Sequence, residues 1–200
     1  MSGPAPTSGV VLLGDSLSVG AFPSLHELVP GSTLVAKVGA SIAWMEGRAA
    51  EIAATLPAVV LVMGGTNDLP GAAPEEVFAR LEGLVLALRG RGVPRVVVGL
   101  LPPQRGPGDA RVDALNELLL SWRPLEGVRV EPVGRALSVE DVSGDPMGIH
   151  PSPEGYARLG AAWADVLAGR EVDVARGGFG VAGVAVLGLA LWGVSRWLRA

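Results

Sequence analysis

Three short polar motifs in this sequence contain the side chains that acyl transfer by a serine requires. Ser16 lies in a Gly-Asp-Ser-Leu tetrapeptide directly after the apolar run 10–13. Asn67 lies in Gly-Thr-Asn-Asp directly after another apolar run, and His150 precedes a proline further along the chain. A serine hydroxyl is a weak nucleophile unless a base lies beside it, and histidine is the most common base. The motifs therefore supply a nucleophile, a polar donor and a base.

Each of these residues also has an ordinary structural explanation. A serine between a strand and a helix is a typical helix N-cap, and an asparagine after a strand is a typical turn residue. The other histidine, His26, lies inside a helical pattern and is interpreted as a surface residue. Ser16 and Asn67, however, follow the first and third predicted strands. In the strand order 2-1-3-4-5 these two strands flank the position where ligands bind, so the joint placement favours a site.

Apolar runs and helical patterns alternate along the chain and predict the elements that hold these motifs. Strands are predicted over Val10–Leu13, Thr33–Val38, Ala58–Met63, Arg95–Leu101 and Val128–Val133. These runs lack two-residue alternation, which is typical of strands covered on both faces. Helices are predicted over Ala21–Leu28, Trp44–Leu56, Pro74–Arg89, Asp109–Ser121 and Pro153–Leu167. The alternation predicts an α/β protein of the flavodoxin-like type, with three α/β/α layers and a five-stranded parallel sheet.

Composition excludes several classes of function. The chain has 200 residues, enough for one domain with a sizeable core. It has no cysteine and two histidines, which excludes disulfides and thiolate metal sites and disfavours a histidine-rich metal site. The net charge is −4 and no basic stripe occurs, so nucleic acid is not an expected partner. We expect no metal and no organic cofactor.

The last part of the chain differs in composition from the rest. We predict a flexible tail over residues 1–8, one domain over 9–170, a polar Gly-rich linker over 171–178 and a transmembrane helix over 179–198. No ionisable side chain occurs between Arg176 and Arg196, and about 20 apolar residues in a helix span a bilayer. A single-pass C-terminal membrane anchor is therefore expected, with the side of the membrane left open. The alternative is a buried or partner-binding apolar helix.

The motifs resemble the sequence blocks of the GDSL-type, or SGNH, hydrolases. The tetrapeptide at 14–17 is similar to the first block and Gly39 to the glycine of the second. Residues 65–68 are similar to the third block, and His150 with the following proline to the last. Pro102-Pro103 followed by Asn116 also resembles the variable region of these enzymes. The resemblance covers residues 9–170.

This resemblance implies a fold, a reaction and a set of roles. It implies the SGNH-hydrolase fold and a serine esterase that hydrolyses carboxylic esters, either acyl or acetyl, on small molecules or polymers, without a cofactor. Ser16 is expected to be the nucleophile and His150 its general base. The backbone N–H groups of Ser16 and Gly39, with the side-chain amide of Asn67, are expected to form the oxyanion hole, the set of donors for the charge that develops in acyl transfer.

One position departs from the family pattern. The family usually has an aspartate three residues before the histidine, where this chain has Met147. Either Asp145, five residues before His150, completes a Ser-His-Asp triad, or a backbone carbonyl orients the ring in a Ser-His pair.

Other functions stay open for the same residues. The chain could be a weak or inactive member of the fold that binds carbohydrate or another ligand. It could also be a membrane or virion structural protein that carries a hydrolase domain as a passenger. An anion-binding module at the turn before the first helix is a further alternative, but it assigns no role to His150 or Asn67.

Overall fold

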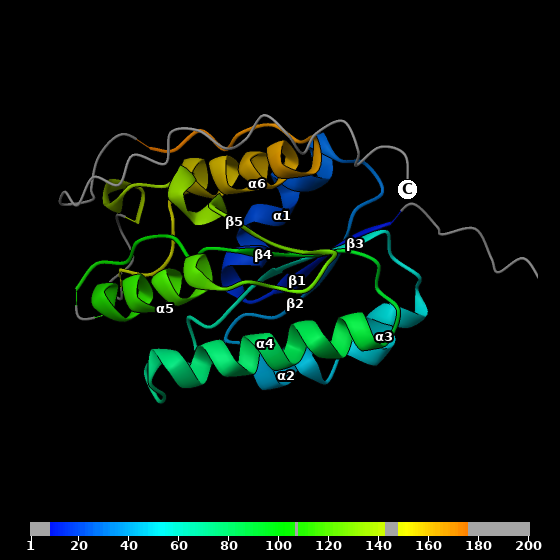
Figure 1. Cartoon of the computed structure of the whole chain (residues 1–200). Coiled ribbons are helices and arrows are strands. Elements are labelled where there is room, and N and C mark those ends of the chain that lie inside the picture. The colour runs from blue at the N-terminus through cyan, green and yellow to red at the C-terminus, as the bar shows by residue number, and fades with distance from the viewer. Residues whose placement is uncertain (1–8, 107, 143–147, 176–200) are drawn as a thin grey trace, which may run out of the picture.

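A five-stranded parallel sheet forms the centre of the protein (Figure 1). The computed structural model describes residues 9–106, 108–142 and 148–175. Its strands lie in the order β2-β1-β3-β4-β5, which confirms the predicted order. The strands are β1 (Val10–Gly14), β2 (Thr33–Ala36), β3 (Val59–Met63), β4 (Val96–Gly99) and β5 (Val128–Glu131).

Helices cover both faces of the sheet, so the predicted three layers are confirmed (Figure 1). On one face lie α1 (Ser16–Leu28) and α6 (Pro153–Leu167). On the other face lie α2 (Ile42–Glu46), α3 (Ala49–Ala54), α4 (Pro74–Gly90) and α5 (Asp109–Ser121). Two 3₁₀ turns, η1 (Val133–Ala136) and η2 (Val139–Val142), lead from β5 toward α6. None of these helices is long and apolar enough to cross a bilayer within the described part of the chain.

Two helix predictions were wrong in their bounds. The first helix begins at Ser16 and not at Ala21, because the Asp15 side chain accepts a hydrogen bond from the N–H of Leu17 and caps the helix directly after the strand. The single helix predicted over 44–56 is two helices, since Gly47 and Arg48 form a turn with ψ of −14° and −9°. Such ψ values tighten the backbone relative to an α-helix. The apolar helix predicted over 179–198 lies outside the described residues.

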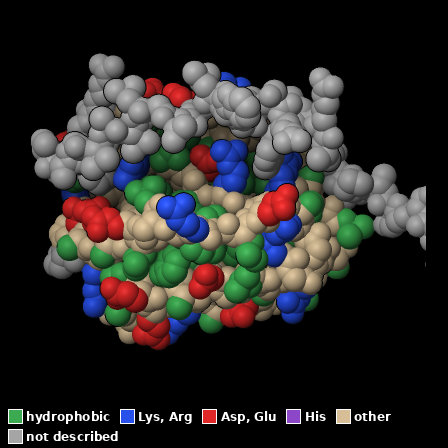
Figure 2. All heavy atoms as spheres, viewed as in Figure 1, with side chains coloured by type: hydrophobic (Ala, Val, Ile, Leu, Met, Phe, Trp, Pro, Cys, Tyr) green, Lys and Arg blue, Asp and Glu red, His purple; other side chains and the backbone are tan. Residues whose placement is uncertain are grey.

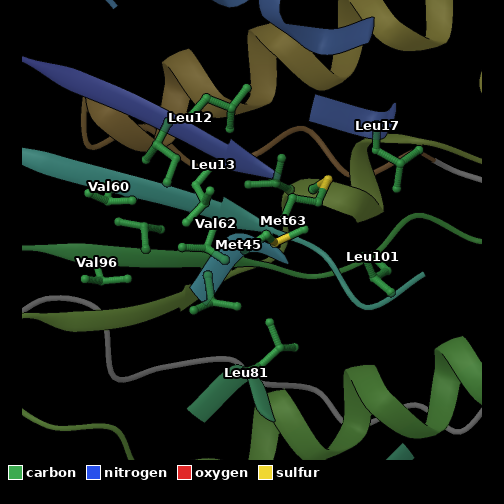
Figure 3. Packing of buried hydrophobic residues seen from close by; sticks show 14 of the residues in the cluster. Leu12, Leu13, Leu17, Met45, Val60, Val62, Met63, Leu81, Val96 and Leu101 are labelled. Atoms are coloured by element: carbon green, nitrogen blue, oxygen red, sulfur yellow. The ribbon is translucent and has the colours of Figure 1, made fainter. Parts of the chain in front are cut away.

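The core lies on both sides of the sheet and consists mainly of aliphatic side chains. All five residues of β3 are buried, as expected for a central parallel strand. Figure 3 shows side chains of β1, β3 and β4 packed together with Met45 of α2 and Leu81 of α4. Each such side chain stabilises the fold by about 1.5–3 kcal/mol when it leaves water. The core therefore holds the carboxyl ends of the strands, where the polar motifs begin, in fixed positions.

The outer surface carries charges of both signs. On the face seen in Figure 2, Lys and Arg side chains alternate with Asp and Glu side chains over the described atoms. A stripe of basic side chains is the arrangement that binds a nucleic-acid backbone, and that face has no such stripe.

Candidate active site

Ser16 and His150 meet at the carboxyl edge of the sheet although 134 residues separate them. His150 Nε2 lies 3.1 Å from Ser16 Oγ. Ser16 is the first residue of α1, directly beyond β1, and His150 lies in the loop before α6. A contact of this length is a hydrogen bond and allows proton transfer between the two atoms. The structure thus brings together the two residues whose types are suited to nucleophile and base.

A tight turn after β1 positions Ser16. A Cβ atom on Gly14 would lie 2.0 Å from Ser18 Oγ and 2.4 Å from the carbonyl oxygen of Met63. The position therefore accepts only glycine without displacement of the neighbouring strand. Asp15 follows as the helix N-cap, fully buried, with its Oδ1 3.0 Å from the N–H of Leu17. The serine hydroxyl consequently projects from the first turn of a capped helix.

A close contact between α1 and α6 positions the loop that carries His150. A Cβ atom on Gly20 would lie 2.2 Å from the ring of Tyr156, and one on Gly160 would lie 2.5 Å from the carbonyl oxygen of Ala21. Without a side chain, Gly160 lies against the backbone of α1, and Gly20 leaves room for the ring of Tyr156 from α6. This close contact brings the N-terminus of α6, and the histidine just before it, over the start of α1.

Backbone hydrogen bonds hold the same loop from its other side. The N–H of Arg105 donates to the carbonyl of Gly148 at 2.9 Å, and the N–H of Ser152 donates to the carbonyl of Asp141 at 2.7 Å. Ser152 is also the N-cap of α6 and accepts a hydrogen bond from the N–H of Gly155. His150 thus lies between two fixed points of the backbone.

The acidic residue expected to orient His150 is not among the described residues. Asp145, the candidate third member, and Met147 both lie outside them. Two other carboxylates precede His150, and both have other partners. Asp141 accepts from the N–H of Ser138 at 2.8 Å and pairs with Arg158. A hydrogen bond from the Ser138 side chain lowers the pKa of the Glu140 carboxyl below its usual value.

The three candidate oxyanion donors come from three neighbouring strands. Ser16 is the first helical residue of α1, where an N–H has no acceptor within the helix. Gly39 has φ of +75°, with open space around the position of a Cβ. The Asn67 side-chain Nδ2 donates to the carbonyl of Ala40 at 3.0 Å and lies 3.4 Å from Asp15 Oδ2. Asn67 is therefore held between the β1 and β2 loops, close to both other donors.

A buried carboxylate lies beneath this cluster. Burial raises the pKa of the Asp15 carboxyl to about 6, whereas its hydrogen bond with the N–H of Leu17 and the charge of His150 act in the opposite direction. Asp68 raises it further through like-charge repulsion. The ionised form of Asp15 is therefore costly in the folded protein.

Asp68 has a role that the sequence did not predict. Its Oδ2 accepts from the N–H of Ile42 at 3.0 Å, and its Oδ1 accepts from Arg80 at 3.2 Å. Ile42 begins α2, directly after the loop that contains Gly39. Asp68 thereby ties the β3 loop to the β2 loop, and with them Asn67 to Gly39. The sequence shows an acidic residue at the end of the third motif, but it does not show that this residue bonds to Ile42, which is 26 positions away.

The second histidine does not take part in this site. His26 is exposed on α1, with Nδ1 3.1 Å from the carbonyl oxygen of Ser32 and its ring against Phe22. The interpretation of His26 as a surface residue is therefore confirmed. The described residues contain no cluster of His, Asp and Glu that could hold a metal ion.

A pocket of about 360 Å³ lies next to the loops that carry Asn67 and His150, since Thr66 and Ile149 line it. Its walls come from the loop after β3, from the segment that joins β4 to α5, and from the residue before His150. The lining residues are Thr66, Leu69, Pro70, Gln104, Arg105, Gly108, Arg111 and Ile149. The volume is that of a small-molecule pocket.

Known proteins give independent information on this arrangement. The sequence profile of the GDSL-like lipase/acylhydrolase family matches residues 12–158, more than half of the chain. No curated protein matches the chain.

Solved structures share the fold at low sequence identity. A carbohydrate esterase family 3 protein from Talaromyces cellulolyticus has a TM-score of 0.70 at 18% identity, over 82% of this chain and 97% of that one. The lipase/acylhydrolase from Enterococcus faecalis has a TM-score of 0.67 at 18% identity, over 84% and 100%. The catalytic domain of peptidoglycan O-acetyltransferase A from Streptococcus pneumoniae has a TM-score of 0.62 at 17% identity, over 82% and 93%.

Proposed function

We propose that this chain hydrolyses carboxylic esters through Ser16 and His150. The chain belongs to the GDSL-like lipase/acylhydrolase family, a family of ester hydrolases. The observation that carries this proposal is the 3.1 Å contact between Ser16 Oγ and His150 Nε2. Both atoms belong to residues that the family blocks mark, and they lie at the edge of the sheet where α/β proteins bind ligands.

In the proposed reaction His150 removes the proton from Ser16 as the hydroxyl oxygen attacks the ester carbonyl. The tetrahedral intermediate collapses when His150 returns that proton to the departing alcohol, which leaves an acyl group on Ser16. Water, activated by the same histidine, then attacks the acyl-enzyme and releases the acid. The cycle needs one base that acts twice, which is what a single histidine beside the nucleophile supplies.

The oxyanion of the intermediate would be bound by the N–H groups of Ser16 and Gly39 and by the side-chain amide of Asn67. The amide of Asn67 donates to the carbonyl of Ala40 in the free enzyme. A small rotation would transfer one of its two hydrogens from a protein acceptor to the oxyanion. The donor would thus strengthen its bonding as the charge develops, which favours the transition state over the bound ester.

For the third member of the site we propose Asp145, with a Ser-His pair as the alternative. The observation in its favour is indirect. The described carboxylates just upstream of His150, on Glu140 and Asp141, bond to Ser138 and Arg158. In the alternative, a backbone carbonyl would hold the imidazole, and replacing Met147 by aspartate would raise the turnover.

For the substrate we propose an ester with a short acyl group, on a small molecule or a polymer. The structurally similar peptidoglycan O-acetyltransferase supports an acetyl group, and the structurally similar carbohydrate esterase supports an ester on a carbohydrate. The pocket of about 360 Å³ next to the loops of Asn67 and His150 has the volume of a small-molecule site. Nothing in the reaction calls for a metal ion or an organic cofactor.

We also propose that residues 179–198 attach the enzyme to a membrane. The support is the length of the segment and its lack of ionisable side chains between Arg176 and Arg196. The full chain should pellet with membranes and resist carbonate at high pH, whereas a chain cut after Gly169 should stay in solution and keep its activity. A full chain that stays in solution without detergent would contradict the anchor.

Hydrolysis of 4-nitrophenyl acetate by the full chain tests the esterase proposal. The wild type should release 4-nitrophenol, and Ser16→Ala should lose that activity while its circular dichroism stays native. Ser121→Ala is the matched control, because Ser121 lies at the end of α5 and bonds only within its own helix. Equal turnover in the Ser16→Ala and Ser121→Ala variants would contradict the proposal and favour a ligand-binding protein.

A further inference from the structure

The pocket next to the loops of Asn67 and His150 contains two arginine side chains in a chain whose net charge is −4. Arg105 comes from the segment after β4 and Arg111 from the first turns of α5. Both are exposed at the pocket. The net negative charge of the protein does not account for two arginines in one small pocket.

Each guanidinium is held in place but keeps most of its donors. Arg105 Nε donates to the carbonyl of Val139 at 3.1 Å, and Arg111 Nη1 donates to the carbonyl of Leu69. A guanidinium has five N–H donors, so each of these bonds leaves four for another acceptor. Anchoring by one backbone carbonyl lowers the entropy that the side chain would lose on binding a ligand.

Among the described residues, no Asp or Glu lies within ion-pair distance of either guanidinium. Asp109 accepts from the N–H of Gln104 at 3.2 Å. A hydrogen bond from Ser138 and the charge of Arg105 lower the pKa of the Glu140 carboxyl, but Arg105 and Glu140 form no ion pair. The positive charge of the pocket is therefore available to a bound molecule.

Buried polar groups complete the walls. Thr66 and Gln104 line the pocket and are 6% and 7% exposed. The Thr66 hydroxyl is buried without a hydrogen-bond partner. An unsatisfied buried hydroxyl costs free energy that a ligand oxygen can recover. The walls thus combine charged, amide and hydroxyl donors with the apolar side chains of Leu69, Pro70 and Ile149.

The place of the pocket shows which part of an ester it would hold. His150 must reach the departing alcohol in order to protonate it, and Ile149, the residue before it, lines the pocket. Gly39 and Ala40, in the loop after β2, do not line it. We propose that this pocket binds the alcohol part of the ester and selects an alcohol that carries a carboxylate or phosphate group, which Arg105 and Arg111 bind. This inference rests on the proposed esterase function.

A pair of model acetates that differ by one charge tests the proposal. The full chain is assayed with 4-acetoxybenzoate and with its neutral analogue 4-acetoxybenzamide, and the ratio of the two kcat/KM values is compared among variants. Arg105→Gln and Arg111→Gln should each lower the ratio about 10-fold, the usual scale of a charge-assisted hydrogen bond. The wild-type ratio should also fall as salt rises, because exposed charges are screened.

Arg91→Gln is the matched control. Arg91 is exposed at the far end of α4 and, like Arg111, donates to one backbone carbonyl. Its ratio should equal that of the wild type. Ratios that are the same in all four proteins would overturn the proposal. A change confined to an ester with its charge on the acyl side, such as phenyl hemisuccinate against phenyl acetate, would overturn the assignment of the pocket to the alcohol.

Binding without turnover separates this inference from the esterase proposal. Calorimetry with 4-acetoxybenzoate on Ser16→Ala protein should show binding that weakens about 10-fold when Arg111→Gln is added. An inactive wild type with this binding difference would contradict the esterase function and leave the anion pocket standing. If the wild type hydrolyses neutral acetates but Ser16→Ala binds 4-acetoxybenzoate equally with and without Arg111→Gln, the esterase function would stand and the anion pocket would be contradicted.

Discussion

The two halves of the candidate site are held in place by different kinds of force. The half with Ser16, Gly39 and Asn67 is held by polar bonds between strand loops, through the buried carboxylates of Asp15 and Asp68. The half with His150 depends on how closely α6 approaches α1, which is a matter of shape at two glycines. Buried carboxylates are therefore the main support of the nucleophile half, whereas helix packing supports the base half in addition to the backbone hydrogen bonds of its loop.

Each half should therefore be sensitive to a different kind of substitution. Buried hydrogen bonds contribute less to stability when the charge or the geometry of a partner changes. A close contact with the backbone is disrupted when a larger side chain is introduced. Substitutions in the two halves should therefore produce distinct signatures in turnover, stability and pH dependence.

Removal of the base should have the largest effect. His150→Ala should lower kcat by about 10⁴-fold or more, because a nucleophile and its base act as one unit. His26→Ala should change kcat little, since His26 is exposed and bonded to the carbonyl of Ser32. Steady-state hydrolysis of 4-nitrophenyl acetate checks both variants, and a larger loss in His26→Ala would mean that the base has been misassigned.

Removal of one oxyanion donor should have the next largest effect. Asn67→Ala should lower kcat by about 10²-fold with little change in KM, since the donor acts on the charge of the transition state. A rise in KM with unchanged kcat would show instead that Asn67 only holds the substrate. Asn116→Ala is a useful contrast, because Asn116 bonds both the N–H and the carbonyl of Leu101 and should affect stability rather than kcat.

Added volume between α1 and α6 should affect both stability and turnover. Gly160→Ala places a Cβ 2.5 Å from the carbonyl oxygen of Ala21, so it should destabilise the fold by about 1–3 kcal/mol. The forced separation should also lower kcat about 10-fold, because a shift near 1 Å disturbs the contact between Ser16 and His150.

Gly83 provides the matched helix control for that substitution. It lies in α4 with nothing near the position of a Cβ. Gly83→Ala should therefore stabilise the protein by about 0.5–1 kcal/mol with unchanged kcat. Thermal unfolding and steady-state kinetics measure both variants, and equal melting temperatures for the two would refute the packing explanation of the base half.

The buried carboxylate of Asp15 should make the free energy of unfolding depend on pH. Its folded pKa, about 6, is above the ordinary aspartate pKa of 3.8. The folded state therefore binds more protons than the unfolded state between these pH values, and stability falls as pH rises through this window. One pKa unit corresponds to about 1.4 kcal/mol, so the fall is on the order of 2–3 kcal/mol.

Asp15→Asn removes that titration and keeps an acceptor for the helix cap. The difference in unfolding free energy between variant and wild type should shift in favour of the variant from pH 4 to pH 7. Denaturant unfolding at both pH values measures the shift, which is independent of any fixed cost of the substitution. A constant difference would mean that Asp15 is ionised in the folded state throughout this range.

The sequence predicted the parts of the site that follow from local pattern. Apolar runs ending in polar motifs located the carboxyl edge of the sheet, and parallel strand order then brought Ser16 and Asn67 together. The start of α1 at Ser16 was missed because the helix-capping role of Asp15 was not recognised. The break at Gly47 and Arg48 was missed because a modest change in ψ leaves little trace in composition.

Features that depend on two distant segments could not be predicted. The contact of Gly20 and Gly160 with the opposite helix is invisible in either segment alone. The same holds for Asp68, whose bond to Ile42 joins two loops, and for the two arginines of the pocket. Local pattern shows where polar residues end an element, whereas tertiary packing decides which of them meet.

Covalent labelling with a fluorophosphonate tests the central claim, the activation of Ser16 by His150, most directly. The reagent reacts with an activated serine hydroxyl, and mass spectrometry of the digested protein locates the adduct. We expect one phosphonate on the peptide that contains Ser16, no adduct in Ser16→Ala, and strongly slowed labelling in His150→Ala. An adduct on another residue, or labelling of the Ser16→Ala protein at the wild-type rate, would contradict the account.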